Sequence, residues 1–182
     1  MKCKIKIEGI SPLLFSKTTG DISKKDALSD DDTAEAGCYR HKNGELAMPT
    51  ANIKASIRYG YSYGYANWKD KDMNFGQDVS IEPVDSSDPM NVSTGQKKYE
   101  IFKRPVLIGR DKRGSFAAAG TAVNAQVDDW TLEFIITSAL TDVTIESLKE
   151  IIEKAGFRGG IGGFRKGGYG RYKIVNFEVL ES

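Results

Sequence analysis

Residues 156–170 combine glycine with positive charge in a pattern that suits anion binding. Eight of these fifteen residues are glycine, which permits positive φ angles and a close approach of the backbone to a ligand. Successive backbone amides in such a segment can surround an anion. Within and just after the segment lie basic and aromatic side chains: Arg158, Phe164, Arg165, Lys166, Tyr169 and Arg171. The basic groups can pair with phosphate, and the rings offer faces on which bases can stack.

Other interpretations of this segment are a flexible linker, a dinucleotide-binding loop or a P-loop. The linker stays open as an alternative. The dinucleotide-binding loop has its glycines after a strand and before a helix. Here the order is reversed, because the glycines follow a predicted helix at 144–155 and precede a predicted strand at 172–180. The P-loop is excluded by the same order and by the lack of a Gly-Lys-Ser/Thr sequence.

Residues 48–58 form a second stretch whose residue types could have a functional role. Pro49 suits the entrance of a helix, and Thr50 could cap it. Lys54 and Arg58 are four residues apart, which places both side chains on one face of that helix. A solvated face is one interpretation of such a pair.

These two stretches, about a hundred residues apart, resemble motifs of the RAMP superfamily of CRISPR-associated proteins. Residues 163–171 are similar to the RAMP glycine-rich loop, which typically ends in Gly-Tyr-Gly-Arg before a terminal strand. Residues 48–58 resemble the helix-opening motif of the RNA-binding backbone subunits of CRISPR effector complexes, with a type III-like character. Thr50-Ala51-Asn52 stands where that motif commonly has Gly-Ser-Ser. The resemblance therefore points to a divergent relative, with a stand-alone protein as the alternative to a subunit of a complex.

The resemblance implies that this chain binds an RNA backbone through its phosphates, independently of sequence. The residues that match the RNA-binding positions are Lys54, Arg58, Arg165, Lys166, Gly167, Gly168, Tyr169, Gly170 and Arg171. The glycines among them would let backbone amides approach phosphate. The resemblance also implies partners, namely a guide RNA or another single-stranded RNA and either further copies of this chain or CRISPR effector subunits.

Catalytic residues are not clearly indicated. Backbone subunits of type III complexes cleave target RNA with an aspartate in a long first loop, and Asp32 is the candidate here. It lies in a run of three aspartates, which is typical of a solvated turn, so we favour no cleavage. His41 is the only histidine and could act as a lone general base, but its polar neighbours predict a surface position. We expect neither a metal site nor a cofactor.

Hydrophobic periodicity predicts the elements that position these residues. Alternation in residues 2–8 and 131–138 predicts strands, as do the β-rich stretches 99–108 and 115–123. A helix from Pro49 should end at Gly60 and Gly64, and an amphipathic helix should run from a Thr144 cap to Ala155 with Gly156 behind it. The order predicts an α+β chain with a ferredoxin-like (RRM-like) βαββαβ fold. We expect one domain over residues 1–182, with long irregular insertions at about 16–43 and 66–96.

The composition of the chain limits which partners and which cellular compartment we expect. The net charge of +1 gives no global attraction to nucleic acid or anionic membrane, but bases gather in residues 97–113 and 154–173. If these two stretches converge, a nearly neutral chain presents a basic face. The cysteines, Cys3 and Cys38, have no metal-site or disulfide spacing, and no apolar run has the length of a membrane span. We therefore expect a cytoplasmic protein that does not associate with membranes.

Three functions are compatible with the sequence. The first is an RNA-backbone-binding protein that assembles side by side along RNA. The second is a structural or interaction homologue, for example from a mobile element, that kept the fold without the RNA function. The third, which we favour least, is a metal-dependent ribonuclease that uses the run from Asp30 to Asp32.

Overall fold

A four-stranded antiparallel sheet forms the centre of the computed structural model, which describes residues 1–17, 29–63, 75–108, 118–141 and 143–181. The strands lie in the order β4–β8–β1–β9. Their bounds are Lys2–Gly9 for β1, Val79–Pro83 for β4, Thr131–Ser138 for β8 and Tyr172–Glu181 for β9. With one helix after β1 and another after β8, this is the ferredoxin-like βαββαβ arrangement. The predicted fold class is confirmed.

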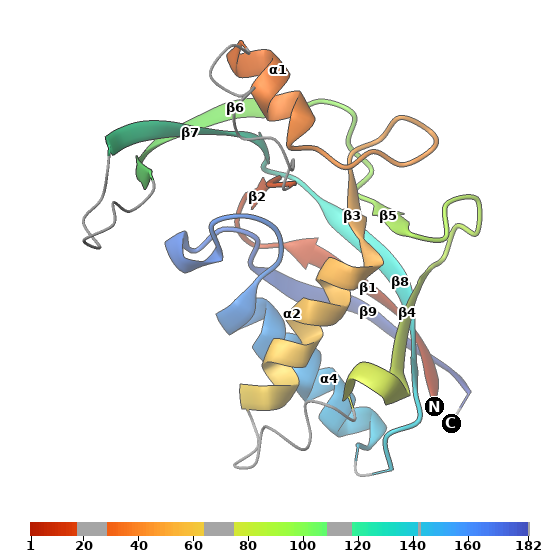
Figure 1. Cartoon of the computed structure of the whole chain (residues 1–182). Coiled ribbons are helices and arrows are strands. Elements are labelled where there is room, and N and C mark those ends of the chain that lie inside the picture. The colour runs from red at the N-terminus through yellow and green to blue at the C-terminus, as the bar shows by residue number, and fades with distance from the viewer. Residues whose placement is uncertain (18–28, 64–74, 109–117, 142, 182) are drawn as a thin grey trace.

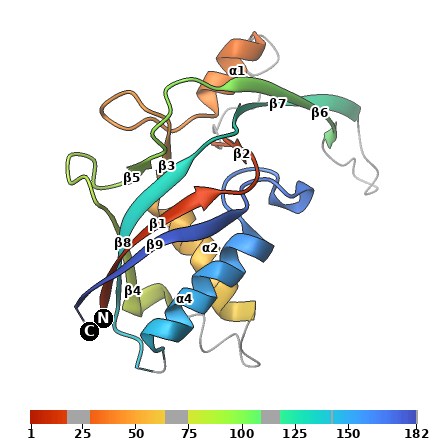
Figure 2. The same ribbon diagram turned by 180° about the vertical axis from the view of Figure 1, so that it is seen from behind.

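The two helices of the motif, α2 (Thr50–Tyr63) and α4 (Ile145–Lys154), cover the same face of this sheet (Figures 1 and 2). Alternation in β1 puts Cys3, Ile5 and Ile7 under the helices, where each is at most 1% exposed. The apolar residues of β8 face the same way, as predicted. The hydrophobic residues of the two helices complete the core: Ile53, Ile57, Tyr61, Leu148, Ile151 and Ile152. Thr144 caps α4 through a capping box with Ser147, so the predicted cap is confirmed.

Gly60 has a different role from the one predicted, because α2 continues through it to Tyr63. A Cβ at Gly60 would lie 2.3 Å from the carbonyl oxygen of Ile151 and 2.8 Å from the Cβ of Ala155. The missing side chain therefore allows α2 to lie directly against α4. The other predicted helix end, Gly64, lies outside the described residues.

The strand β4, which is the second strand of the βαββαβ motif in chain order, was not predicted from the sequence. Residues 66–96, predicted as an irregular insertion, contain β4 of the central sheet and also β5 (Asn91–Ser93). The latter pairs with β3 (Ala47–Pro49) in a separate two-stranded ribbon. Pro83 and the acidic residues around it obscured a strand of only five residues.

The strand predicted at 99–108 exists, as does the described part of the one predicted at 115–123, but both belong to a second sheet. They are β6 (Glu100–Ile108) and β7 (Ala118–Val127), which pair with each other along their whole length. This hairpin projects from the body of the molecule (Figure 1). Its other partner is the short β2 (Leu13–Leu14), which pairs with Gln126 and Val127 at the base of the hairpin.

The first loop, predicted as irregular at 16–43, contains helix α1 (Asp30–Ala36), which lies on the hairpin (Figures 1 and 2). The carboxylate of Asp30 forms an ion pair with Lys103 of β6. Arg40, just after the helix, forms a bidentate ion pair with Glu35 and also donates to the carbonyls of Gly44 and Lys97. The bidentate contact lowers the pKa of the Glu35 carboxyl. Part of the predicted loop is therefore an ordered element that braces the hairpin.

The chain does not leave α4 at Gly156 as predicted. One π-helical turn, Ala155–Gly159, continues the helix, and Gly160 then turns the backbone with a φ of 66°. A 3₁₀ turn, Arg165–Gly167, follows before β9 begins. We call residues 159–171 the glycine loop.

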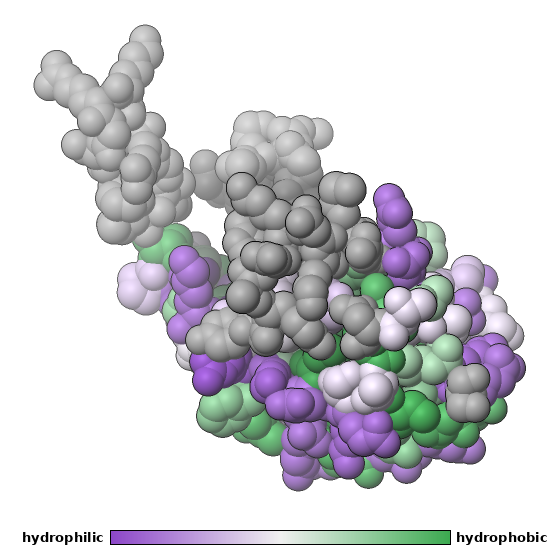
Figure 3. All heavy atoms as spheres, turned by 90° about the horizontal axis from the view of Figure 1, so that it is seen from below, coloured by the Kyte–Doolittle hydropathy of each residue, from purple (hydrophilic) through white to green (hydrophobic). Residues whose placement is uncertain are grey.

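Among the described residues, no helix is long and apolar enough to span a membrane. At the end of the molecule that faces away from α1, small groups of hydrophobic and hydrophilic residues are interspersed (Figure 3).

The contact at Gly60 predicts a specific response to mutation. Gly60→Ala should destabilise the protein, although alanine favours helix by about 1 kcal/mol over glycine, because the new methyl group collides with α4. Gly76→Ala is the matched control, since a Cβ there meets nothing within 4 Å. Urea unfolding should give a lower free energy of unfolding for the first variant only. A stabilised Gly60→Ala protein would show that the two helices do not touch at this point.

Candidate nucleic-acid interface

The glycine loop is fixed to the segment between β1 and β2. The amide of Gly163 donates to the carbonyl of Leu14 and that of Gly170 to the carbonyl of Pro12, both at 2.7 Å. The amide of Arg171 donates to the hydroxyl of Ser11 at 2.8 Å. These three bonds hold the loop in one place beside the base of the hairpin.

Ser56 ties the glycine loop to α2 from inside the molecule. Its buried hydroxyl donates to the carbonyl of Gly160 at 2.9 Å and lies 3.0 Å from the hydroxyl of Tyr172. Complete burial raises the pKa of Tyr172, so the phenol stays neutral and can share this hydrogen bond. A serine in the middle of α2 thus joins the start and the end of the loop.

The backbone amides of Gly167, Gly168 and Gly170 are already hydrogen-bonded inside the protein. Gly167 and Gly168 donate to the carbonyls of Phe164 and Arg165, and the Gly170 amide is used by Pro12. A Cβ at Gly170, where φ is 69°, would lie 1.8 Å from the carbonyl oxygen of Ile161. The expected approach of the three glycine amides to phosphate is therefore not supported by this geometry. The basic side chains of the loop are left as the groups that can meet an anion.

Those side chains surround a hollow of about 350 Å³ between α2 and the glycine loop. We call it the basic hollow, and its lining residues are Tyr59, Arg158, Gly159, Arg165, Lys166 and Arg171. Three of the residues predicted to bind RNA thus lie together. Arg158, one of the basic residues of the predicted anion-binding segment, lies with them, whereas Tyr59 was not predicted from the sequence. Tyr59 lies in a stretch rich in tyrosine, and nothing in that stretch distinguished it as a residue of the site.

Three cations of the basic hollow have no acidic partner among the described residues. Within the described residues, no carboxylate forms an ion pair with Arg165, Lys166 or Arg171. The Nη1 atom of Arg171 is buried without a hydrogen-bond partner, as is Nε of Arg104 on β6. A buried guanidinium nitrogen without an acceptor is costly, so a ligand that supplies an oxygen atom would be favoured at this place.

The residues predicted on α2 lie apart from the basic hollow. Lys54 donates to the carbonyl of Gly76 at 2.9 Å, which directs its ammonium group toward that chain segment. Arg58 is exposed on α2, immediately before Tyr59, but does not line the hollow. The structure therefore groups Arg165, Lys166 and Arg171 and leaves Lys54 and Arg58 outside that group.

The two basic stretches of the sequence meet at the glycine loop. The guanidinium of Arg104 lies 4.1 Å from the ring centroid of Phe164, and the rings of Phe102 and Tyr169 are 5.1 Å apart. Not all of the first stretch contributes, because Lys103 is paired with Asp30. The bases at 110, 112 and 113 lie outside the described residues.

The face of the central sheet that turns away from the helices is a poor alternative for RNA. In RRM domains this face stacks bases on aromatic side chains. Here β1 contributes Lys2, Lys4, Lys6 and Glu8 to it. Lys4 pairs with Glu133 at 3.3 Å, and Glu8 pairs with Lys173 at 3.5 Å. Such a ladder of opposite charges lacks both the stacking rings and the excess positive charge.

The catalytic candidate Asp32 lies in the first turn of α1. Ser29 caps this helix by accepting from the amide of Asp32, and its hydroxyl donates to the Asp32 carboxylate at 2.6 Å. This reciprocal pair stabilises a helix start, which is a structural use of the side chain. Within the described part of the chain, no group of three or more His, Cys, Asp and Glu side chains could hold a metal ion.

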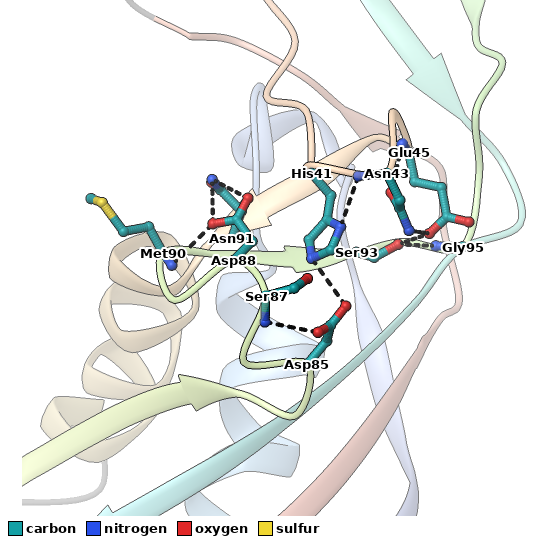
Figure 4. A network of polar contacts seen from close by, with 10 residues as sticks. All are labelled: His41, Asn43, Glu45, Asp85, Ser87, Asp88, Met90, Asn91, Ser93 and Gly95. Carbon is teal, nitrogen blue, oxygen red and sulfur yellow. Dashed lines mark hydrogen bonds and ion pairs between the residues drawn. The ribbon is translucent and has the colours of Figure 1, made fainter.

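His41 is buried, contrary to the predicted surface position. Only 3% of it is exposed, and its Nδ1 accepts from the amide of Asn43 at 3.4 Å (Figure 4). Its Nε2 lies 3.6 Å from a carboxylate oxygen of Asp85 in the loop between β4 and β5. The Arg-His-Lys sequence suggested a solvated turn. The loop between β4 and β5, however, lies over the imidazole and shields it from water.

Hydrogen bonds around His41 hold the neighbouring acids in their charged form (Figure 4). Ser93 and Asn43 donate to Glu45, which lowers the pKa of that carboxyl. Burial opposes the ionisation of Asp88, yet donors from Asn91 and the Met90 amide outweigh it, so the pKa of Asp88 is also lowered. The network fastens the loop after β4 onto the β3–β5 ribbon.

Comparison with known proteins gives a structural match without a sequence match. No family model matches the chain, and no curated protein matches it. A chain in a cryo-EM structure of the Type III-B Cmr-beta bound to cognate target RNA superposes with a TM-score of 0.60 at 13% sequence identity. The match covers 99% of this chain and 60% of that one. The likeness shows a shared fold, and this chain spans about three fifths of the length of that chain.

The packing of the glycine loop predicts unequal effects at two glycines with positive φ. Gly168→Ala should lower the free energy of unfolding by about 1–2 kcal/mol, because only backbone strain is added and a Cβ there meets nothing within 4 Å. Gly170→Ala should cost at least about 2 kcal/mol more, because its Cβ collides with the backbone at Ile161. Denaturant titration would measure both. Equal losses would mean that the loop is not closed on itself as described.

Proposed function

We propose that this protein binds the phosphate backbone of RNA, independently of sequence, at the basic hollow and the glycine loop. The observation that carries the proposal is the cluster of Arg165, Lys166 and Arg171 around one hollow without compensating acids. Phosphate groups supply the negative charge and the oxygen acceptors that these side chains lack. The similarity to a chain of an RNA-bound Cmr complex supports RNA as the anion.

The proposal gives the residues of the site different tasks. Arg165, Lys166 and Arg171 contact phosphates directly, with Arg158 beside them. Lys54 and Arg58 extend the path along α2, beyond the hollow. Gly167, Gly168, Tyr169 and Gly170 shape the loop that carries the cations. Because phosphates carry no sequence information, binding should tolerate any base order.

We also propose a place for the protein among CRISPR-associated proteins. On this view residues 1–182 form one divergent RAMP unit that lies side by side with further copies of itself, or with effector subunits, along a guide RNA. The two motifs at residues 48–58 and 163–171 and the ferredoxin-like fold support this view. A homologue that kept the fold for protein interaction alone is the competing function.

The dependence of binding on salt tests the RNA proposal. The protein should bind single-stranded RNA at low salt, with an affinity that falls steeply as salt rises, because counterions are released from the RNA. Arg165→Ala and Lys166→Ala should each weaken binding and make the salt slope shallower by about 0.7, the value for one phosphate of a single strand. Fluorescence anisotropy over a salt series measures both quantities.

One variant serves as the control in the same titration. Lys149→Ala removes one exposed charge from α4, away from the hollow, and should leave the slope unchanged. If the folded parent does not bind RNA at low salt, the interaction homologue is the better description. Loss of intact RNA only when Mg²⁺ is present would favour the ribonuclease.

Assembly along RNA is tested by light scattering. Long single-stranded RNA should yield particles in which many copies share one RNA, and the mass should rise with RNA length. RNA too short for two copies should give a one-to-one complex. A constant one-to-one stoichiometry at every length would contradict side-by-side assembly and leave RNA binding itself intact.

A further inference from the structure

A row of aromatic and guanidinium groups connects β6 to the glycine loop. The rings of Phe102 and Tyr169 have centroids 5.1 Å apart, and those of Tyr169 and Phe164 are 5.7 Å apart. The guanidinium carbon of Arg104 lies 4.1 Å from the centroid of the Phe164 ring. The row thus ends in an arginine. One of its members, Phe164, directly precedes Arg165, which lines the basic hollow.

Phe164 occupies its place at a cost in backbone energy. With φ 48° and ψ 40° it is the one non-glycine residue at positive φ in the described part of the chain. A bulky aromatic side chain rarely adopts this conformation. Gly167 provides the room, because a Cβ there would lie 2.2 Å from the Phe164 ring. Strained conformations persist only where the surrounding structure enforces them, and they are frequent at ligand-binding sites.

Arg104 lacks the partners of an arginine that only stabilises a fold. Within the described residues it has no carboxylate partner, and its Nε is buried without a hydrogen-bond acceptor. Arg104 is half-buried as a residue, and Phe164, whose ring lies beneath its guanidinium group, is 41% exposed. Unpaired bases stack on aromatic rings and on the planes of arginine guanidinium groups. The end of the row therefore has the chemistry of a base-stacking surface.

We propose that Arg104, Phe164 and Tyr169 form a stacking platform for one unstacked nucleobase of a single-stranded RNA. The inference rests on the proposed function, because a phosphate of the same strand lies in the basic hollow. Phe164 and Arg165 are adjacent in the chain, so a base and its own or neighbouring phosphate can reach both groups at once.

The platform selects a class of nucleic acid. A base inside a duplex is stacked on both sides and paired, and its extrusion costs a few kcal/mol. A single strand presents its bases at little cost. Every base has a π face, so the platform does not distinguish one base from another. The ligand is therefore single-stranded RNA of any sequence, and duplex RNA is disfavoured.

The experiment compares two single-stranded probes of equal length, an oligouridine and an abasic ribose-phosphate oligomer. The parent protein should bind the oligouridine more tightly, because only that probe can stack. Arg104→Lys keeps the charge but loses the planar group, and Phe164→Leu removes the ring beneath it. Each should weaken oligouridine binding about 5- to 100-fold, the range for one stacked base, and leave abasic binding and its salt slope unchanged. Lys149→Ala is the control for both probes.

The outcomes separate this inference from the proposed function. Equal affinity of the parent for the two probes overturns the platform and leaves phosphate binding in place. An equal loss for both probes in Arg104→Lys also overturns it, since Arg104 then acts only as a charge. No binding of either probe at low salt overturns the proposed function.

A crosslinking measurement on the unmodified protein guards against variants that fail to fold. Oligouridine containing 4-thiouridine, irradiated on the parent protein, should crosslink to the peptide that carries Phe164 and Tyr169 or to the one that carries Phe102 and Arg104. Mass spectrometry identifies the peptide. Crosslinks confined to other peptides would place the bases elsewhere and contradict the proposal.

Discussion

The segment from Ile10 to Leu14 forms hydrogen bonds along both of its edges, and the candidate site depends on them. On one side it accepts from Gly163 and Gly170 of the glycine loop, and the amide of Ile10 donates to the carbonyl of Arg171. On the other side Leu13 and Leu14 pair with β7. Trp130 adds a bond from its indole to the carbonyl of Ser11 at 2.9 Å. Five consecutive residues therefore set the position of the loop relative to the hairpin, and with it the contact of Arg104 with Phe164.

Much of this arrangement could be predicted from local patterns, and the failures have physical causes. Alternation in β1 and the Thr144 cap depend on neighbouring residues, so the sequence alone revealed them. Gly60 was taken as a helix end because glycine weakens helices, but its role depends on Ile151 and Ala155, ninety residues away. The strand β4 is short and ends in proline, and it is stable only because β8 lies beside it. The burial of His41 likewise requires the distant loop at Asp85.

In the candidate site, the identity of the residues was easier to predict than the way they act. Glycine and arginine at 156–171 indicated an anion-binding segment, and the structure gathers Arg165, Lys166 and Arg171. The sequence suggested that the glycines free their amides for a ligand, whereas the amides of Gly167, Gly168 and Gly170 are satisfied inside the protein. Hydrogen-bond partners far along the chain decide this point, and no local pattern contains them. A rigid loop holds its cations in place before a ligand arrives, which lowers the entropy lost on binding.

The pairing of β1 with β9 joins the two ends of the chain, with Lys2 opposite Glu181. During synthesis β1 is made before its partners β8 and β9, which lie more than a hundred residues further along the chain. The two edges of β1 therefore stay without their hydrogen-bond partners until β8 and β9 have been synthesised. The glycine loop and the segment that holds it are separated in the same way. Folding of the central sheet and completion of the candidate site both depend on contacts between residues distant in sequence, which form slowly.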